Sequence, residues 1–305
     1  MRVRAFAKIN RSLRVVATRA DGYHELRTIF QSIALHDTLT FRQVRGPFEL
    51  ACDDPACPTD ETNLIARAAA QMWSASGRKG APHGVAIHLV KRIPMQAGLG
   101  GGSSDAAVAL RVLAKRWRVA GAKIRDAAAL LGADVPYFLE GGTMLGLDRG
   151  DLLFPLHEPA SAWVVLVIPD FGVSTREAFG WFDARGGARG GARGLQPSGS
   201  ELRARRSPET LALPGWPEGL ALREMVNDLE APVAEHHPEI ARIISALRRA
   251  GAAQAAMSGS GSAVFGLFSD RSAASAAMTR LSAGSLRTLL TKTVNRQTYQ
   301  RLAAT

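Results

Sequence analysis

A glycine-rich run followed at once by serines and an aspartate most constrains how this 305-residue chain can fold. Residues 96–107 read QAGLGGGSSDAA. Glycine lets successive backbone N–H groups turn inward with no Cβ in the way. Beyond the run, Ala106, Leu110, Leu113 and Trp117 recur at helical spacing, so a helix is predicted to begin near Ser103. The unpaired N–H groups of that helix would face the glycines, and the run therefore predicts a cradle for a polyphosphate.

The alternative without a bound phosphate is a flexible loop before a capped helix, because Ser and Asp are ordinary N-cap residues. Other phosphate-binding patterns are absent: no Gly-x-x-x-x-Gly-Lys-Ser/Thr stretch occurs. Residues 170–172 read DFG, as in protein kinases, but no His-Arg-Asp loop precedes them. We interpret these three residues as a turn after a strand.

Apolar periodicity predicts strands and helices in irregular alternation, which favours an α+β fold in two domains, 1–157 and 158–305. The first strand, 3–16, is expected to be interrupted near Lys8. Asp60 or Thr62 is the expected cap of a helix over 63–74. The other predicted strands are 28–44, 85–90, 143–147, 163–168, 263–268 and 286–294, and the other helices 103–117, 123–131, 224–235, 238–250 and 271–283.

The composition narrows the class of protein. The formal charge of +11 is compatible with a nucleic-acid partner, but aromatic residues make up only 6% of the chain. A nucleic-acid partner is therefore not expected. No apolar run of about 18 residues predicts a membrane helix, and the first ten residues lack a secretory pattern. A cytoplasmic protein is expected, in which Cys52 and Cys57 are unpaired thiols. The sequence assigns no oligomeric state.

Three motifs, at residues 5–10, 94–107 and 257–265, resemble in order and spacing those of the galactokinase, homoserine kinase, mevalonate kinase and phosphomevalonate kinase (GHMP) superfamily. The resemblance implies an N-terminal domain like the second domain of ribosomal protein S5 and a ferredoxin-like C-terminal domain. It also implies a small-molecule kinase that uses ATP and Mg²⁺. No residue is assigned as a magnesium ligand.

Two further stretches, 19–26 and 132–138, resemble the subfamily that phosphorylates the 2-hydroxyl of a cytidine-diphosphate-linked methylerythritol in the non-mevalonate isoprenoid pathway. That resemblance implies Lys8 and Asp134 as catalytic residues. The chemistry agrees, because an attacking alcohol must lose a proton and a nearby carboxylate can accept it. Lys8 would provide positive charge for the developing alkoxide.

The same resemblance implies two sets of binding residues. The nucleotide is assigned to Pro94, Met95, Gln96, Ala97, Gly98, Leu99, Gly100, Gly101, Gly102, Ser103 and Ser104, with Asn63, Leu64 and Lys91 at the adenine. The acceptor substrate is assigned to Asn10, Tyr23, His24, Phe179, Gly259, Ser260 and Gly261. Tyr23 and Phe179 offer flat faces to a pyrimidine, and His24 a polar edge.

Two departures from the family pattern bear on these expectations. Arg11 replaces an apolar residue, and a bulky cation is expected near the methylerythritol site. Residues 185–200 form a low-complexity insertion. Two alternatives stay open: another GHMP kinase, of the homoserine or mevalonate kinase type, or a basic nucleic-acid-binding protein on an S5-like fold.

Overall fold

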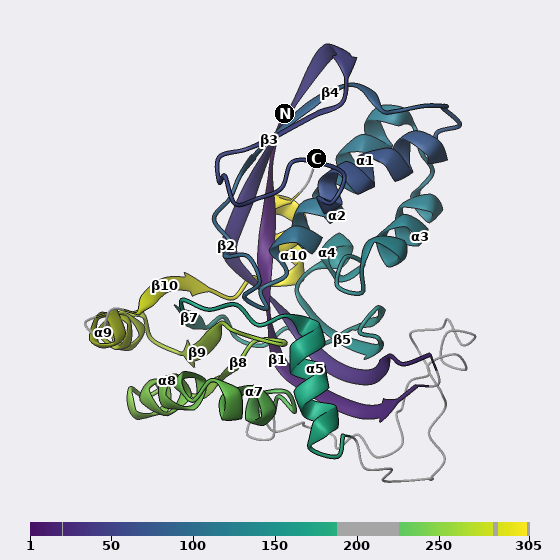
Figure 1. Cartoon of the computed structure of the whole chain (residues 1–305). Coiled ribbons are helices and arrows are strands. Elements are labelled where there is room, and N and C mark those ends of the chain that lie inside the picture. Colours follow the sequence, from purple (N-terminus) through teal and green to yellow (C-terminus); the bar gives the residue numbers. More distant parts are fainter. Residues whose placement is uncertain (20, 188–225, 283–285, 304–305) are drawn as a thin grey trace.

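The computed structural model describes residues 1–19, 21–187, 226–282 and 286–303. Its first sheet is built on two long antiparallel strands, β1 (Arg2–Thr18) and β2 (His24–Pro47) (Figure 1). The rest of the sheet is β3 (Glu49–Cys52), β4 (His83–Val90), β5 (Thr143–Asp148) and β6 (Leu152–Pro155), in the order β3-β4-β2-β5-β6 with β1 paired to β2. Only β3 and β4 pair in parallel. The interruption predicted near Lys8 is a register shift between Phe6 and Lys8, after which the strand continues.

Four helices pack on one side of this sheet: α1 (Leu64–Ala75), α2 (Gly101–Trp117), α3 (Gly121–Leu131) and the short α4 (Tyr137–Glu140) (Figure 1). Their apolar faces bury Met72 and Leu110 against Leu39 and Ile87 of the strands. The predicted cap of α1 is wrong: the side chain of Asn63, directly before the helix, accepts a hydrogen bond from the backbone N–H of Ile65.

The second sheet contains β7 (Trp163–Ile168), β8 (Gln254–Met257), β9 (Val264–Phe268) and β10 (Arg287–Lys292). Their order is β10-β7-β9-β8, and every neighbouring pair is antiparallel. With α5 (Thr175–Ala184), α7 (Glu230–His236) and α8 (Glu239–Arg249) between β7 and β8, and α9 (Arg271–Ser282) between β9 and β10, this is the β-α-β-β-α-β arrangement. The predicted ferredoxin-like second half, and the two-domain α+β class, are confirmed.

The two halves share strands and core. Leu13 and Val15 of β1 belong to the same buried cluster as Ile244 of α8, and Ile9 packs against the opposite face of the second sheet. In return the last helix, α10 (Arg296–Leu302), leaves the second sheet and buries Tyr299 against the first half. The domain boundary at residue 157 stays a prediction.

Two further predictions concern the chain in and near the low-complexity insertion, residues 185–200. The helix predicted over 224–235 begins only at Glu230, because the side chain of Asn227 is held by the carbonyls of Met257 and Gly259 and Leu13 forms a bridge with Asn227. Residues 224–225, and the low-complexity insertion beyond residue 187, lie outside the described residues. Residues 170–171 form a bend between β7 and α5, where a turn was predicted, and both cysteines are free thiols. Among the described helices, none combines the length and apolarity needed to cross a bilayer.

Candidate active site

An open cleft of about 1340 Å³ runs between the two halves of the molecule. It is lined by the glycine run, by the start of β2 and by the start of α5. Small-molecule sites usually enclose roughly 300–1000 Å³, so this cleft has room for two ligands side by side. All but one of the predicted site residues line it, the exception being Ser104.

The first glycine loop, residues 96–102, turns directly into α2 on the wall of this cleft. Gly98 and Gly100 have positive φ angles of 72° and 71°. A Cβ on Gly98 would lie 2.0 Å from the carbonyl oxygen of Ser258, and one on Gly100 would lie 2.6 Å from the Phe138 ring. Only glycine therefore fits either position.

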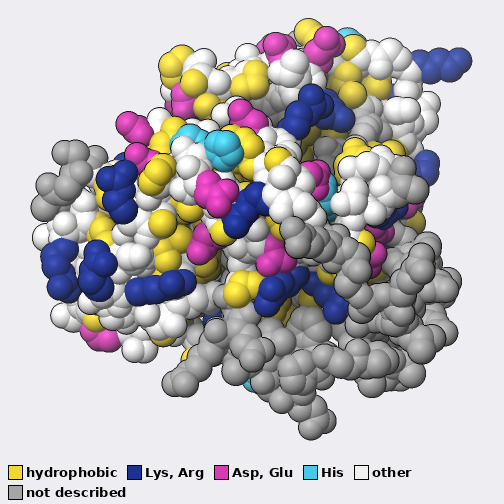
Figure 2. Space-filling view, turned by 60° about the horizontal axis from the view of Figure 1, so that its bottom comes forward, with side chains coloured by type: hydrophobic (Ala, Val, Ile, Leu, Met, Phe, Trp, Pro, Cys, Tyr) yellow, Lys and Arg dark blue, Asp and Glu magenta, His cyan; other side chains and the backbone are white. Residues whose placement is uncertain are grey.

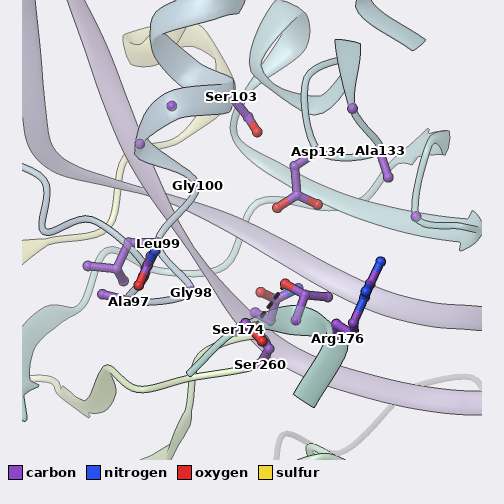
Figure 3. A pocket seen from close by; sticks show the side chains of 18 of the residues that line it. Ala97, Gly98, Leu99, Gly100, Ser103, Ala133, Asp134, Ser174, Arg176 and Ser260 are labelled. Carbon is purple, nitrogen blue, oxygen red and sulfur yellow. Dashed lines mark hydrogen bonds between the residues drawn. The ribbon is translucent and has the colours of Figure 1, made fainter. Parts of the chain in front are cut away.

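α2 begins at Gly101, two residues before the predicted Ser103, and Gly100 offers no side chain to cap it. The first N–H groups of the helix are thus left for a ligand. Of the two predicted serines, Ser103 faces the cleft, whereas the Ser104 hydroxyl is buried in the helix packing without a hydrogen-bond partner. Figure 3 shows Ser103 above the loop and Asp134 across from it.

Lys8 and Asp134 meet on the cleft side of β1. The Lys8 ammonium lies 3.3 Å from the Asp134 carboxylate, and the Lys8 side chain is 4% exposed against 33% for Asp134. Lys8 also donates to the Asn10 side-chain oxygen, and the Asn10 amide donates to the Thr28 hydroxyl at 2.7 Å. The aspartate is therefore the member of the pair that a substrate can reach, while the lysine is held behind it by a buried network.

A second glycine loop, residues 258–262, lies against the first. The Ser258 hydroxyl donates to the carbonyl of Gly98 at 2.9 Å and accepts from the Asn10 N–H at 3.2 Å. The Asn227 amide donates to the carbonyls of Met257 and Gly259. Sequence reasoning assigned no role to either residue, although Ser258 lies within the 257–265 motif to which Asn227 donates its hydrogen bonds.

Lys91 reaches the cleft but its ammonium is already engaged. It pairs with Asp37 and, at 3.1 Å, with Asp105 near the start of α2. Burial, with Asp37 adding to it, raises the pKa of the Asp105 carboxyl to about 8, against the opposing charge of Lys91. Asp37 accepts hydrogen bonds from Lys91 and from the backbone N–H groups of Arg92 and Ile93. The network ties α2 to the end of β4.

The residues predicted at the cytosine gather at the other end of the cleft. The His24 ring stacks on Phe179 with centroids 4.5 Å apart, and its Nε2 lies 2.8 Å from an Asp183 carboxylate oxygen. Tyr23 is 58% exposed, and the Arg149 guanidinium lies 5.7 Å from its ring centroid. These five side chains form an aromatic pocket with one cation and one carboxylate. Sequence reasoning found Tyr23, His24 and Phe179 but neither Arg149 nor Asp183.

The expected effect of Arg11 on this site is wrong. Successive side chains of a strand point to opposite faces, so Asn10 lines the cleft and Arg11 does not. Arg11 is buried elsewhere, where its Nε donates to Gln254 at 3.4 Å and its carbonyl accepts from the Gln254 amide. Desolvation by burial lowers its pKa.

An α+β chain with a glycine loop at a helix start, beside a lysine–aspartate pair, defines the GHMP class of small-molecule kinases. The family models described as "GHMP kinases N terminal domain" and "GHMP kinases C terminal" match residues 63–142 and 215–284. The chain belongs to the 4-diphosphocytidyl-2-C-methyl-D-erythritol kinase family within that class. It is therefore a small-molecule kinase, and this class implies ATP as the phosphate donor.

The relatives that show this cover almost the whole chain. The kinase of that name from Solibacter usitatus is 44% identical over 89% of this chain and 82% of its own length. The one from Moorella thermoacetica is 40% identical over 95% and 98%. A crystal structure of 4-(cytidine 5'-diphospho)-2C-methyl-D-erythritol kinase superposes with a TM-score of 0.74 at 32% identity, covering 96% of this chain and 99% of that one. A mevalonate kinase structure, at 12% identity and a TM-score of 0.64, shares the fold alone.

Proposed function

We propose that this kinase transfers the γ-phosphoryl group of ATP to the 2-hydroxyl of 4-diphosphocytidyl-2-C-methyl-D-erythritol, in the cytoplasm, as a step of isoprenoid synthesis. The observation that carries the proposal is the position of the Lys8–Asp134 pair. It lies between a glycine loop suited to phosphates and an aromatic pocket suited to a pyrimidine. The names of the full-length relatives support the choice of substrate.

Asp134 is the group that takes the proton. The acceptor alcohol loses its proton as it attacks the γ-phosphorus, and the exposed carboxylate of Asp134 accepts it. Lys8, held by Asn10 behind the carboxylate, supplies positive charge to the developing alkoxide. Positioning of the two substrates in one cleft provides the rest of the rate enhancement.

The donor phosphates fit the first glycine loop. The absence of any Cβ at Gly98 and Gly100 and the uncapped start of α2 give backbone N–H groups to the phosphate oxygens. No group of three or more His, Cys, Asp or Glu among the described residues is placed to hold a metal ion. Mg²⁺ would be held mainly by ATP and water, with the Ser103 hydroxyl and the Asp134 carboxylate as candidate protein oxygens in the cleft, and it would supply charge neutralisation.

The aromatic pocket favours a cytidine-bearing acceptor over homoserine or mevalonate, neither of which has a ring to stack. A nucleic-acid partner gains no support from the middle of the face in Figure 2, where acidic and basic side chains are interspersed. Interspersed charge gives a polyanion no continuous track.

The test is coupled detection of ADP with ATP, Mg²⁺ and a panel of acceptors. We expect turnover with the cytidine-diphosphate-linked methylerythritol and none with homoserine, mevalonate or methylerythritol phosphate. Turnover of homoserine or mevalonate instead would assign the chain to another activity of the superfamily.

A further inference from the structure

Nearly every charged side chain that lines the cleft is paired with a neighbour. Each lining carboxyl group has a Lys, Arg or His side chain beside it, in the pairs Asp21–Arg19, Asp105–Lys91, Asp134–Lys8 and Asp183–His24. Of the lining cations, Arg149 pairs with Asp151 at 2.8 Å. Among the described residues of the lining, Arg176 is the charged side chain left with neither a hydrogen bond nor an ion pair.

Arg176 projects into the cleft from the first turn of α5. Figure 3 shows its side chain extending from the start of that helix toward Ala133, the residue before Asp134. Phe179 follows it by three residues, which places both side chains on the same face of α5. The adjacent Glu177 does not neutralise it, because that carboxylate turns back to accept from the N–H and hydroxyl of Ser174.

Arg176 therefore lies between the aromatic pocket and the catalytic carboxylate. An acceptor whose base stacks at His24 and Phe179 and whose hydroxyl reaches Asp134 must pass its linking group across the start of α5. In a cytidine-diphosphate-linked substrate that group is a diphosphate with two negative charges. A guanidinium is suited to it, because its planar N–H groups bind two phosphate oxygens at once.

We propose that Arg176 binds the diphosphate of the acceptor substrate and so distinguishes cytidine diphosphate compounds from unphosphorylated nucleosides. This inference rests on the proposed function and adds a specificity-determining residue to it. Arg176 takes no part in the chemistry, which belongs to Lys8 and Asp134.

The first test compares two ligands that differ only in the diphosphate. Calorimetry gives the dissociation constants of CDP and of cytidine for the wild type, Arg176→Ala and Arg176→Lys. We expect Arg176→Ala to weaken CDP about tenfold, the usual loss of a charge-assisted hydrogen bond, and to leave cytidine unchanged. The CDP dissociation constant of Arg176→Lys should lie between those of the wild type and Arg176→Ala, since lysine keeps the charge but lacks the planar set of N–H donors.

Arg185→Ala is the matched control. Arg185 lies at the other end of α5, outside the cleft, where it is exposed and pairs with Glu235 at 3.3 Å. It removes the same charge from the same helix and should change neither dissociation constant. An equal loss of CDP affinity in Arg185→Ala would mean that overall charge, not contact, is responsible, and would overturn the proposal.

The second test is steady-state kinetics. Arg176→Ala should raise the KM of the cytidine-diphosphate-linked substrate about tenfold while the KM of ATP and kcat change less than about twofold. A rise in the KM of ATP alone would assign Arg176 to the donor, and unchanged KM values for both would remove it from binding; either result overturns the proposal.

The proposed function and the proposed role of Arg176 would be contradicted by different results. If the wild type does not phosphorylate the cytidine-linked substrate, the proposed function fails. If the wild type does so and Arg176→Ala binds CDP and cytidine as the wild type does, only the role of Arg176 fails. A wild type that binds neither CDP nor cytidine would overturn both.

Discussion

At the scale of single residues, the site depends on which side chains are held and which are left accessible. Lys8 is almost fully buried by Asn10 and the bulged β1, whereas a third of the Asp134 side chain is exposed. A charged lysine is costly to bury unless it is paired, so Asp134 and Asn10 also stabilise the fold around it. Replacing Lys8 would therefore mix structural with catalytic effects, and Asp134 is the cleaner position to change.

Asp134→Ala is expected to lower kcat by about 10²–10⁴, the range for removal of a positioned proton acceptor. Binding of a non-hydrolysable ATP analogue should stay near that of the wild type, because the glycine loops are untouched. Stopped-flow or coupled detection of ADP measures the first and calorimetry the second. The exposed Asp126 on α3, outside the cleft, supplies the control variant Asp126→Asn. Full turnover by Asp134→Ala would exclude it from the mechanism.

The buried carboxyl of Asp105 predicts how stability varies with pH. Its pKa is raised to about 8, so the native state holds a proton that the unfolded chain releases above its ordinary pKa. The resulting stability is fully present below that ordinary pKa and is lost as the pH rises through about 8.

Asp105→Asn mimics the protonated form without titrating. The melting temperature of the variant relative to the wild type should therefore increase between about pH 5 and pH 8 and level off above that. Thermal unfolding followed by circular dichroism at each pH measures the difference. Parallel curves across the range would show that Asp105 does not hold the proton.

At the level of single residues, the sequence predicts the residues proposed for the chemistry better than the other charged residues that line the cleft. Lys8, Asp134 and the aromatic pocket lie in recognisable motifs, and the structure brings all of them to one cleft. Arg149 and Arg176 lie outside those motifs, and their proximity to the cleft comes from chain folding alone. Arg11 illustrates the opposite error: it stands directly beside a recognised motif, but the alternation of side chains along β1 turns it to the face away from the cleft.

At the scale of elements, the first glycine loop and α2 act as one unit. The loop is fixed from three sides: Leu99 accepts from the Lys8 N–H at 3.0 Å, Ala97 accepts from the Ala263 N–H at 3.2 Å, and Gly98 accepts from Ser258. The N–H groups that would meet phosphate are therefore held in place before any ligand arrives, which lowers the entropy cost of binding.

Gly98→Ala is expected to destabilise the protein by about 2–3 kcal/mol and to weaken nucleotide binding, because the new Cβ has both a strained φ and a backbone clash. Gly121→Ala is the control, since it lies at the start of α3 with no atom within 4 Å of an added Cβ. Urea titration gives the free energy of unfolding of both. Equal stability of the two variants would mean that the loop adapts to a side chain.

The long, strongly periodic elements are the ones that sequence predicts well. The strand at 163–168 and the helix α8 agree with expectation to within a residue. Most missed elements are short: β3, β6, β8 and α4 have four residues each and α10 has seven, but α5, with ten residues, was missed as well. The late start of α7 has a different cause, since tertiary hydrogen bonds of Asn227 prevail over local helix propensity.

At the scale of the whole molecule, neither half closes its own core. Tyr299 of α10 lies against Phe6 with ring centroids 5.5 Å apart and donates to the carbonyl of Phe138 at 2.7 Å. Leu13 and Val15 belong to the core of the second half. Sequence reasoning placed a boundary between the sheets but had no means to detect this exchange, because the contacts join residues close to opposite ends of the chain.

A fragment of residues 1–157 is therefore expected not to fold by itself. It would expose Phe6, Leu13 and Val15 to water, and a loss of that size exceeds the usual margin of stability. Circular dichroism and a thermal melt of the fragment against the intact chain test this. A cooperative transition of the fragment would instead make residues 1–157 an autonomous domain.

The two long strands also limit how the enzyme can move. β1 and β2 stay hydrogen-bonded to each other as they pass from one half to the other, forming a common spine beneath the cleft. A clamshell closure would have to bend this spine and break its ladder. The position of the two nucleotide sites relative to each other is consequently set when the chain folds. Substrate and product then enter and leave through the open side of the cleft, by rearrangement of side chains.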